Sequence, residues 1–126
     1  MSAGKYSFII EQGATTNLQV DWSDANQNRI DLTGYTAMMQ LRPSVDSELV
    51  YISLSSTLQA DGTGINMSGS NGSTPLVSGS LAIYISAASS SMFDFTEAYY
   101  DLELTNGNTV TRLLEGKAKL SKNVTR

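Results

Sequence analysis

The sequence predicts an all-β fold, in which two antiparallel sheets pack into a sandwich of about eight or nine short strands. Apolar and polar residues alternate with period two along most of the chain, the pattern of half-buried strands. Turn-forming residues separate these runs at intervals of roughly 8–12 residues. Because no run is long enough for the helical crossover that parallel strands need, we expect antiparallel pairing throughout.

Composition favours one domain over residues 1–126 and argues against several functions. Hydrophobic residues make up 40% and charged residues 16% of the chain, which is a globular composition with a largely uncharged polar surface. Cysteine and histidine are absent, which removes thiolate metal sites and the commonest general base. We therefore expect no enzyme, no metal, no cofactor and no small-molecule substrate. A net charge of -4 argues against a nucleic-acid partner, and no apolar run is long enough for a membrane span.

Three strands are predicted in the first third of the chain. Their inward faces are the alternating sets Tyr6, Phe8 and Ile10, then Leu18, Val20 and Trp22, then Tyr35, Ala37, Met39 and Leu41. Gly13 permits the first tight connection, and the turn-forming stretch 23–28 supplies the second. The third strand is expected to end at Arg42, because Pro43 cannot donate a ladder hydrogen bond.

Two further strands and a loop are predicted in the middle of the chain. One strand directs Val50, Ile52 and Leu54 inward and leaves Tyr51 on the opposite face. A short strand around Ile65 and Met67 follows. The stretch 69–79 is rich in glycine, serine and asparagine, so we expect it to be a mobile surface loop.

The last third is predicted to contain three or more strands and a short helical turn. The inward sets are Leu81, Ile83 and Ile85, then Tyr100, Leu102 and Leu104, then Ala118 and Leu120. Residues 86–93 lose the alternation, and a serine-led helical turn is expected there. The pair Asn106-Gly107 predicts a tight β-hairpin.

The final fifteen residues, RLLEGKAKLSKNVTR, carry most of the basic side chains: Arg112, Lys117, Lys119, Lys122 and Arg126. Two interpretations are open. Lys117 and Lys119 project from one face of a strand and could protect an exposed sheet edge from uncontrolled pairing. Alternatively, the basic strip meets an acidic surface of a neighbouring subunit. Residues 122–126 are a candidate tail that orders on a partner, and residues 1–4 are expected to be flexible.

Three tyrosines are further candidates for partner contact. Tyr51, Tyr84 and Tyr99 are out of phase with the aliphatic faces of their strands, so we expect them to be exposed. Trp22, Tyr6 and Tyr35 are in phase with those faces, and core positions are expected for them.

Two groups of acidic and amide residues are candidate chemical sites. Asp24, Asn26 and Asn28 alternate as the first ligands of a calcium loop do, but Arg29 stands where that loop needs glycine, so an ordinary turn is the stronger interpretation. The second group is acidic and consists of Asp94, Glu97, Asp101 and Glu103. A pair of such carboxylates could act in general acid–base catalysis on a glycan. Asp101 and Glu103 alternate with Tyr100, Leu102 and Leu104, which instead favours the outer face of a strand and cross-strand pairs with lysine or arginine.

Three segments resemble, in order and spacing, a family of small structural proteins and N-terminal domains from the tails of tailed bacteriophages. They are FIIEQGATTNLQVDW, IDLTGYTAMMQLRPS and YDLELTNGNTVTRLLEGKAKLSKNVTR. The matching positions are Phe8, Gln12 and Gly13; Asp31 to Tyr35 with Arg42; Tyr100 to Leu104; and Arg112 to Gly116 with Val124, Thr125 and Arg126.

The resemblance implies an immunoglobulin-like sandwich that assembles with other virion proteins as a homo-oligomer, made in the host cytoplasm. No coiled-coil heptads follow the domain, so a tail or baseplate subunit or adaptor is expected rather than a receptor-binding fibre. A capsid decoration or neck protein of the same virion is the nearest alternative. An alternative of another class is a carbohydrate-binding module, for which exposed tyrosines and Asn/Asp loops are the required parts.

Overall fold

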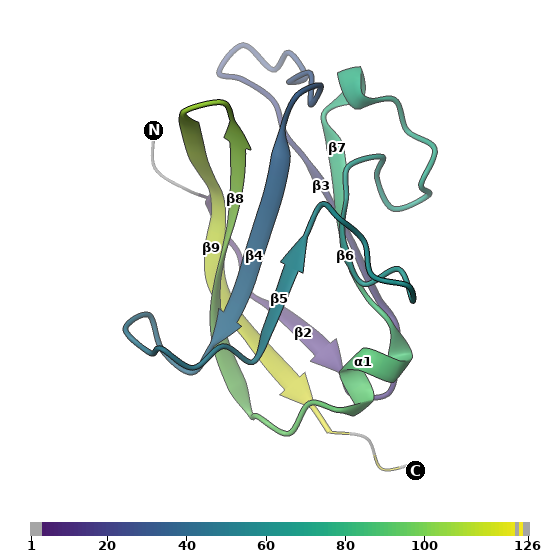
Figure 1. Ribbon diagram of the computed structural model, residues 1–126, viewed down its shortest axis with the longest axis vertical. Coiled ribbons are helices and arrows are strands. Elements are labelled where there is room, and N and C mark those ends of the chain that lie inside the picture. Colours follow the sequence, from purple (N-terminus) through teal and green to yellow (C-terminus); the bar gives the residue numbers. More distant parts are fainter. Residues whose placement is uncertain (1–3, 123, 125–126) are drawn as a thin grey trace.

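The computed structural model of the chain describes residues 4–122 and Val124 (Figure 1). Within this part of the chain the strands are β1 (Gly4–Lys5), β2 (Phe8–Glu11), β3 (Thr16–Asp21), β4 (Thr36–Arg42), β5 (Ile52–Ser55), β6 (Gly64–Asn66), β7 (Ser80–Ile85), β8 (Glu97–Asn106) and β9 (Thr109–Ser121). The two short helical elements are the 3-10 turn η1 (Leu76–Ser78) and helix α1 (Ala87–Ser91). The predicted all-β fold is confirmed, and α1 lies where a helical turn was expected.

Two sheets form the sandwich. The six-stranded sheet has the order β1-β9-β8-β4-β5, with β2 also paired to β9, and the three-stranded sheet has the order β3-β7-β6. The chain crosses between the sheets after β2, β3, β5 and β7. The orders β9-β8-β4-β5 and β3-β7-β6 match those of the two sheets of an immunoglobulin sandwich.

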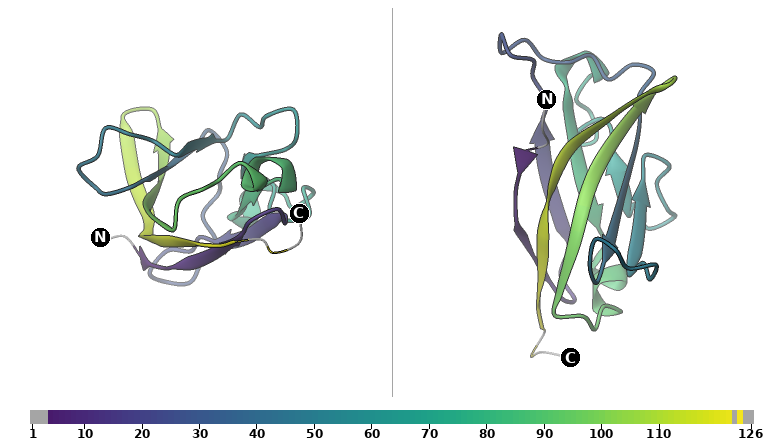
Figure 2. Two further views of the ribbon diagram at one scale, coloured as in Figure 1. Left: turned by 90° about the horizontal axis from the view of Figure 1, so that it is seen from below. Right: turned by 90° about the vertical axis from the view of Figure 1, so that its left-hand side faces the viewer.

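The N-terminal strands depart from the predicted antiparallel pairing. β1 and β2 run parallel to β9, with Gly4 opposite Leu114 and Phe8 opposite Ala118. Figure 2 (right) shows these purple strands beside the yellow β9, although they come from opposite ends of the sequence. Parallel pairing needs no helical crossover here, because the chain visits the other sheet and returns before β9 begins.

The core is formed by the alternating faces of both sheets. Along β8, inward residues are buried while outward residues are half-buried, and the last residue is exposed. The largest fully buried side chains include Ile10, Leu41, Leu54, Ile65, Ile83, Leu102 and Leu104. Each such side chain contributes about 2 kcal/mol through burial, so these faces hold the sheets together.

The β8–β9 hairpin is confirmed, with its turn one residue later than Asn-Gly suggests. Asn106 pairs with Thr109, so the two loop residues are Gly107 and Asn108. Gly107 has a φ of 61°, and a positive φ at the first loop position is typical of a type II′ turn. The strand that follows is one uninterrupted β9 rather than two short strands.

The stretch 69–79, predicted to be mobile, is bonded to the body of the sandwich at several points. Ser70 Oγ donates to Gln19 Oε1 at 2.8 Å, and Leu32 N donates to Leu76 O at 2.9 Å. Mobility of this loop stays a prediction. Among the described residues, no helix is long and apolar enough to cross a membrane.

Candidate functional site

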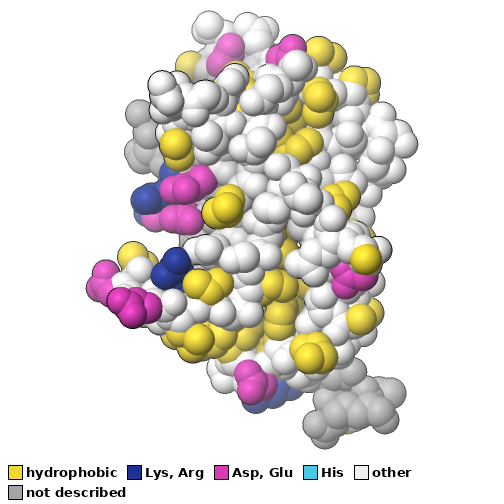
Figure 3. All heavy atoms as spheres, in the orientation of Figure 1, with side chains coloured by type: hydrophobic (Ala, Val, Ile, Leu, Met, Phe, Trp, Pro, Cys, Tyr) yellow, Lys and Arg dark blue, Asp and Glu magenta, His cyan; other side chains and the backbone are white. Residues whose placement is uncertain are grey.

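A charged surface covers the outward side of β1, β8 and β9. We call it the charged face and define it by Lys5, Glu97, Asp101, Glu103, Arg112, Glu115, Lys117 and Lys119. Because successive side chains of a strand point to opposite faces, the polar residues between the buried leucines and Tyr100 of β8 all reach this surface. Figure 3 shows basic and acidic side chains together at its left margin.

Ion pairs join neighbouring strands across the charged face. Lys5 Nζ lies 3.0 Å from Glu115 Oε1, Arg112 Nε lies 3.3 Å from Asp101 Oδ2, and Lys117 Nζ lies 3.7 Å from Glu97 Oε1. The last two pairs are diagonal, since Asp101 is directly opposite Glu115 and Glu97 is opposite Lys119. The predicted cross-strand pairing is confirmed for Asp101, and Glu103 lies directly opposite Arg112. These partly exposed pairs hold the surface in register and add little stability.

A β-bulge turns Arg112 toward the charged face. Leu102 pairs with Leu114, but the next residue, Glu103, pairs with Arg112, so Leu113 is the extra residue. Without the bulge, Leu113 would face Glu103 and Arg112 would point the other way. The bulge thus places a cation beside two carboxylates, an effect for which bulges are known at functional surfaces.

Tyr99 lies at the centre of the charged face. Its ring is half-buried, and Lys117 Nζ lies 5.3 Å from the ring centroid, within the range of a cation–π contact. Arg42 of β4 is paired with Tyr99 on its other side. Tyr99 is therefore a flat apolar centre between two cations.

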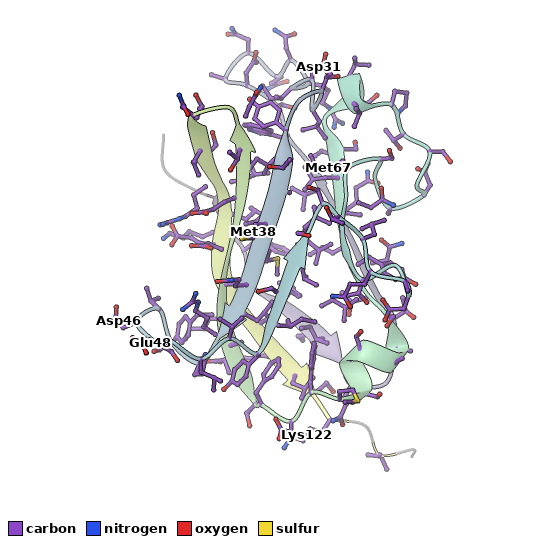
Figure 4. The ribbon with its side chains drawn as sticks, viewed as in Figure 1. Asp31, Met38, Asp46, Glu48, Met67 and Lys122 are labelled. Carbon is purple, nitrogen blue, oxygen red and sulfur yellow. The ribbon has the colours of Figure 1, made fainter. Side chains whose placement is uncertain are left out.

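The loop of residues 43–51 overhangs this centre and makes the surface concave. Arg42 fixes the loop, because its Nη1 donates to Ser47 O at 2.5 Å and its Nη2 donates to Gln40 Oε1 at 2.7 Å. Two adjoining depressions of about 470 Å³ each lie beneath the loop, and Val45 and Tyr99 line both. Figure 4 shows Asp46 and Glu48 at the loop tip, away from the body of the sandwich.

The interpretation of β9 as a protected sheet edge is wrong. β8 lies on one side of β9, and β1 and β2 lie on the other. Between β1 and β2, Tyr6 N donates to Glu115 O at 3.0 Å, and Tyr100 Oη donates to Tyr6 O at 2.6 Å. This crossing requires glycine at position 116, where a Cβ would lie 2.0 Å from Tyr6 O. The lysines of β9 therefore project from an interior strand.

Burial and the hydrogen bond to Tyr6 set the chemistry of Tyr100. Burial, with a smaller contribution from Tyr6, raises the pKa of Tyr100 to about 12. The hydroxyl therefore stays protonated and donating at neutral pH. Tyr6 itself is 45% exposed and not in the core, which corrects its predicted position; its ring stacks on Phe8 at 6.4 Å.

The structure separates the predicted contact residues into several groups. Arg112, Lys117, Lys119 and Tyr99 come together on the charged face. Lys122 is exposed just beyond β9, and Arg126 lies outside the described residues.

Tyr51 and Tyr84 lie elsewhere. Tyr51 precedes β5 and is partly buried, because its ring stacks on Phe95 at 4.5 Å and packs against the core; its predicted exposure is wrong. Tyr84 belongs to the three-stranded sheet, on the other side of the molecule.

Several residues on or beside the charged face were not predicted from the sequence. Lys5 and Glu115 meet only because β1 pairs with β9, and Arg42 acts through the loop that follows Pro43. Local alternation gives a side chain's face but not its neighbouring strand. The Glu115-Gly116 step was the one local signal, since a glycine within a strand often marks close approach of another backbone.

The turn at Asp24 has the geometry of an ordinary Asx turn. Asp24 Oδ1 accepts hydrogen bonds from Asn26 N at 2.9 Å and from Asn28 N at 3.0 Å. Arg29 pairs with Asp21 at 3.2 Å. The hydrogen bond from the Ser80 hydroxyl has the largest effect and lowers the pKa of Asp21; burial opposes it, and Arg29 and Gln19 add further lowering. Over residues 4–122 and Val124, no cluster of three or more acidic side chains could hold a metal ion.

The residues that carry the sequence resemblance fall into two groups: Asp101, Glu103, Arg112 and Glu115 lie on the charged face, whereas the others support the fold. Gln12 Nε2 donates to Phe93 O at 2.6 Å, and Gly13 N donates to Ser90 Oγ at 3.0 Å, which joins the β2–β3 turn to α1. Asp31 Oδ1 accepts from Thr33 N and Thr33 Oγ1 at 2.9 and 2.7 Å, which closes the turn before β4. Comparison with models of protein families and with curated proteins finds no match to this chain.

Proposed function

We propose that this protein is a virion structural protein of a tailed phage, a tail or baseplate subunit or adaptor that acts through protein–protein contacts in a symmetric oligomer. The motifs that resemble phage tail proteins support this placement. The charged face is the surface on which the contact depends. A capsid decoration or neck protein would use the same surface at another station of the virion.

The observation that carries the proposal is the balance of opposite charges on a concave surface. The charged face has four basic residues and four acidic residues, whereas the whole chain has a net charge of -4. A surface with both signs interspersed can pair with a second copy of itself across a two-fold axis, because each cation can meet a carboxylate of the copy.

Apolar side chains on and beside the charged face would form the part of such a contact that is removed from water. Val45 is 79% exposed and Leu49 is 60% exposed on the overhanging loop, and Ile9 is 63% exposed next to Lys119. Interfaces bury an apolar centre inside a polar rim, and charges mainly set orientation and partner choice. The loop of residues 43–51 and Tyr99 would supply that centre in the assembled particle.

The placement is tested by labelling the chain in intact particles and imaging them by electron microscopy. A small ring of label at the tail tip is the expected result. Label over the head shell would replace the tail role with capsid decoration, and label at the neck would give the neck role. Absence of label from every particle would contradict a virion role.

The contact surface is tested by the double charge reversal Lys117→Glu and Lys119→Glu. We expect loss of incorporation into particles while the thermal unfolding midpoint stays close to that of the parent protein. Arg29→Glu is the control, because Arg29 is also an exposed, ion-paired cation but lies outside the charged face, in the connection between β3 and β4. Normal incorporation of the double variant would remove the charged face from the proposal.

A further inference from the structure

The outward side of the three-stranded sheet carries a second, unrelated groove. In a regular sheet Ala82 would be exposed there, opposite Gln19 and Asn66, yet its exposed fraction is 0%. The β6–β7 loop covers it. Asn17 Nδ2 donates to Ser70 O at 3.0 Å, and Ser70 N donates to Gln19 Oε1 at 3.2 Å, so the loop lies over β3 and β7. Tyr84, two residues further along β7, is left half-buried at the margin of the loop.

Tyr84 lies in a depression of about 260 Å³ between two loops. On one side are Gly69 to Gly72 of the β6–β7 loop, and on the other are Leu58, Asp61 and Gly62. Gly62 has a φ of 90°, and a Cβ there would lie 3.2 Å from Tyr84 Cε1. Glycine therefore lets the backbone lie against the Tyr84 ring. Leu58, 42% exposed, forms an apolar lip.

The groove has amide groups in fixed orientations around the ring. Asn66 uses Oδ1 to accept from Ser68 N at 2.9 Å, and Asn17 uses Nδ2 to donate to Ser70 O at 3.0 Å. Each of these side chains thus keeps its second polar group, a donor on Asn66 and an acceptor on Asn17. Fixed polar groups beside an apolar surface are the usual composition of a small-molecule site.

The charge of the groove restricts the ligand. Its lining contains one ionisable carboxylate, that of Asp61, and no lysine or arginine. Asp61 Oδ2 accepts from Ser86 Oγ at 2.6 Å and from Ser89 Oγ at 3.0 Å, and these bonds, with that of Thr63 N, hold the pKa of Asp61 well below its usual range. The carboxylate is therefore ionised at neutral pH and repels anions.

We propose that the Tyr84 groove binds a neutral pyranose residue of a glycan. The C–H face of the sugar ring lies on the Tyr84 ring, and its hydroxyls bond the free amide groups of Asn66 and Asn17. Asp61 excludes sialic and uronic acids. This inference is independent of the virion placement, because it rests on the opposite side of the molecule from the charged face.

The first test is saturation-transfer difference NMR on the full chain. The probes are glucose, galactose, rhamnose, N-acetylglucosamine, their short oligomers and glucuronic acid, each at roughly 10 mM, because one shallow contact gives a millimolar Kd. We expect transfer to at least one neutral sugar and none to glucuronic acid. Absence of transfer to every neutral sugar, or equal transfer to glucuronic acid, would overturn the inference.

Variants then locate the binding. We expect Tyr84→Ala and Tyr84→Leu to weaken binding of the sugar that gave transfer by about tenfold or more, since the Tyr84 ring is the main contact in a small site. The matched control is Tyr99→Ala, a half-buried tyrosine on the other sheet, which should leave the Kd unchanged. Tyr84→Leu keeps an apolar side chain in β7, and its unfolding midpoint shows whether the fold is kept. Folded Tyr84→Leu that binds like the parent, or loss of binding in Tyr99→Ala, would refute the assignment.

Discussion

The outer faces of the two sheets differ in chemistry and in how they are covered. The outward residues of β8 and β9 are mainly charged, and the loop of residues 43–51 overhangs them with a depression beneath it. The outward residues of β3, β6 and β7 are mainly amides, hydroxyls and alanine, and the β6–β7 loop folds over them. Figure 3 shows basic and acidic groups together at the left, with further charged groups at the top and bottom and mostly uncharged groups on the right.

This difference follows from the free energy of desolvation. A loop can cover amides and hydroxyls because its own backbone groups replace the lost water, as Ser70 does for Gln19 and Asn17. Covering ionised side chains costs several kcal/mol per charge unless each is fully paired, so the charged face stays open. The charged face is therefore accessible to a partner, whereas the β6–β7 loop forms one wall of a groove on the outward side of the three-stranded sheet.

The largest expected effect comes from disrupting the contact between β9 and the N-terminal strands β1 and β2. Gly116→Ala places a Cβ 2.0 Å from Tyr6 O and forces β1 away from β9. We expect a loss of about 3 kcal/mol or more in the free energy of unfolding, measured in denaturant. Gly107→Ala is the control: its φ is 61° but nothing lies within 4 Å of the added Cβ. It should cost about 1 kcal/mol, and equal losses in both variants would contradict the crossing at Gly116.

Tyr100→Phe tests the same crossing without adding atoms. It removes the 2.6 Å hydrogen bond to Tyr6 O, and we expect a loss of about 1 kcal/mol below pH 10. Because the folded pKa of Tyr100 is raised from 10.0 to about 12, its protonated form stabilises the parent fully below pH 10, and this contribution falls as pH rises through that interval. The difference between parent and variant should therefore shrink from pH 10 to about 12 in unfolding measurements. A difference between parent and variant that stays constant with pH would contradict the raised pKa of Tyr100.

Gln19→Ala tests the covering of the neutral face. It removes the acceptor for Ser70 N and Ser70 Oγ, and we expect a loss of about 0.5–1 kcal/mol. Hydrogen exchange should quicken in residues 68–74 and stay unchanged in β8. Gln59→Ala changes an exposed glutamine outside this contact and serves as control. Fast exchange of the loop already in the parent would support its predicted mobility instead.

The smallest expected effect is on the ion pairs. Arg112→Ala removes a pair whose side chains are 53% and 43% exposed, and we expect about 0.5 kcal/mol or less, vanishing in high salt. Arg29→Ala should behave alike in the β3–β4 connection, where Arg29 pairs with Asp21 of β3 and the exposed fractions are 46% and 44%. Chemical denaturation with urea at low and high salt measures both. A loss above about 1 kcal/mol for Arg112 alone would mean that the bulge depends on this pair.

The sequence by itself determined which side of each strand is buried and where the local turns lie. Leu102, Leu104 and Ile83 point inward because alternation with period two is a property of one strand, whatever its neighbours. The β8–β9 hairpin and helix α1 are equally local. Ser86 Oγ accepts from Ser89 N at 3.0 Å, the cap that a serine-led turn predicts.

Only the tertiary structure decided which strands are neighbours and which side chains form the sites. The parallel pairing of β1 and β2 with β9, the bulge at Leu113 and the loop over Ala82 join residues far apart in sequence. The alternation along a strand does not determine which strands pair with its two edges, because the backbone hydrogen-bonding groups are nearly the same in every residue. Packing of the whole core selects those partners, and so it placed Arg112 beside Asp101 and left Tyr84 at the margin of a loop.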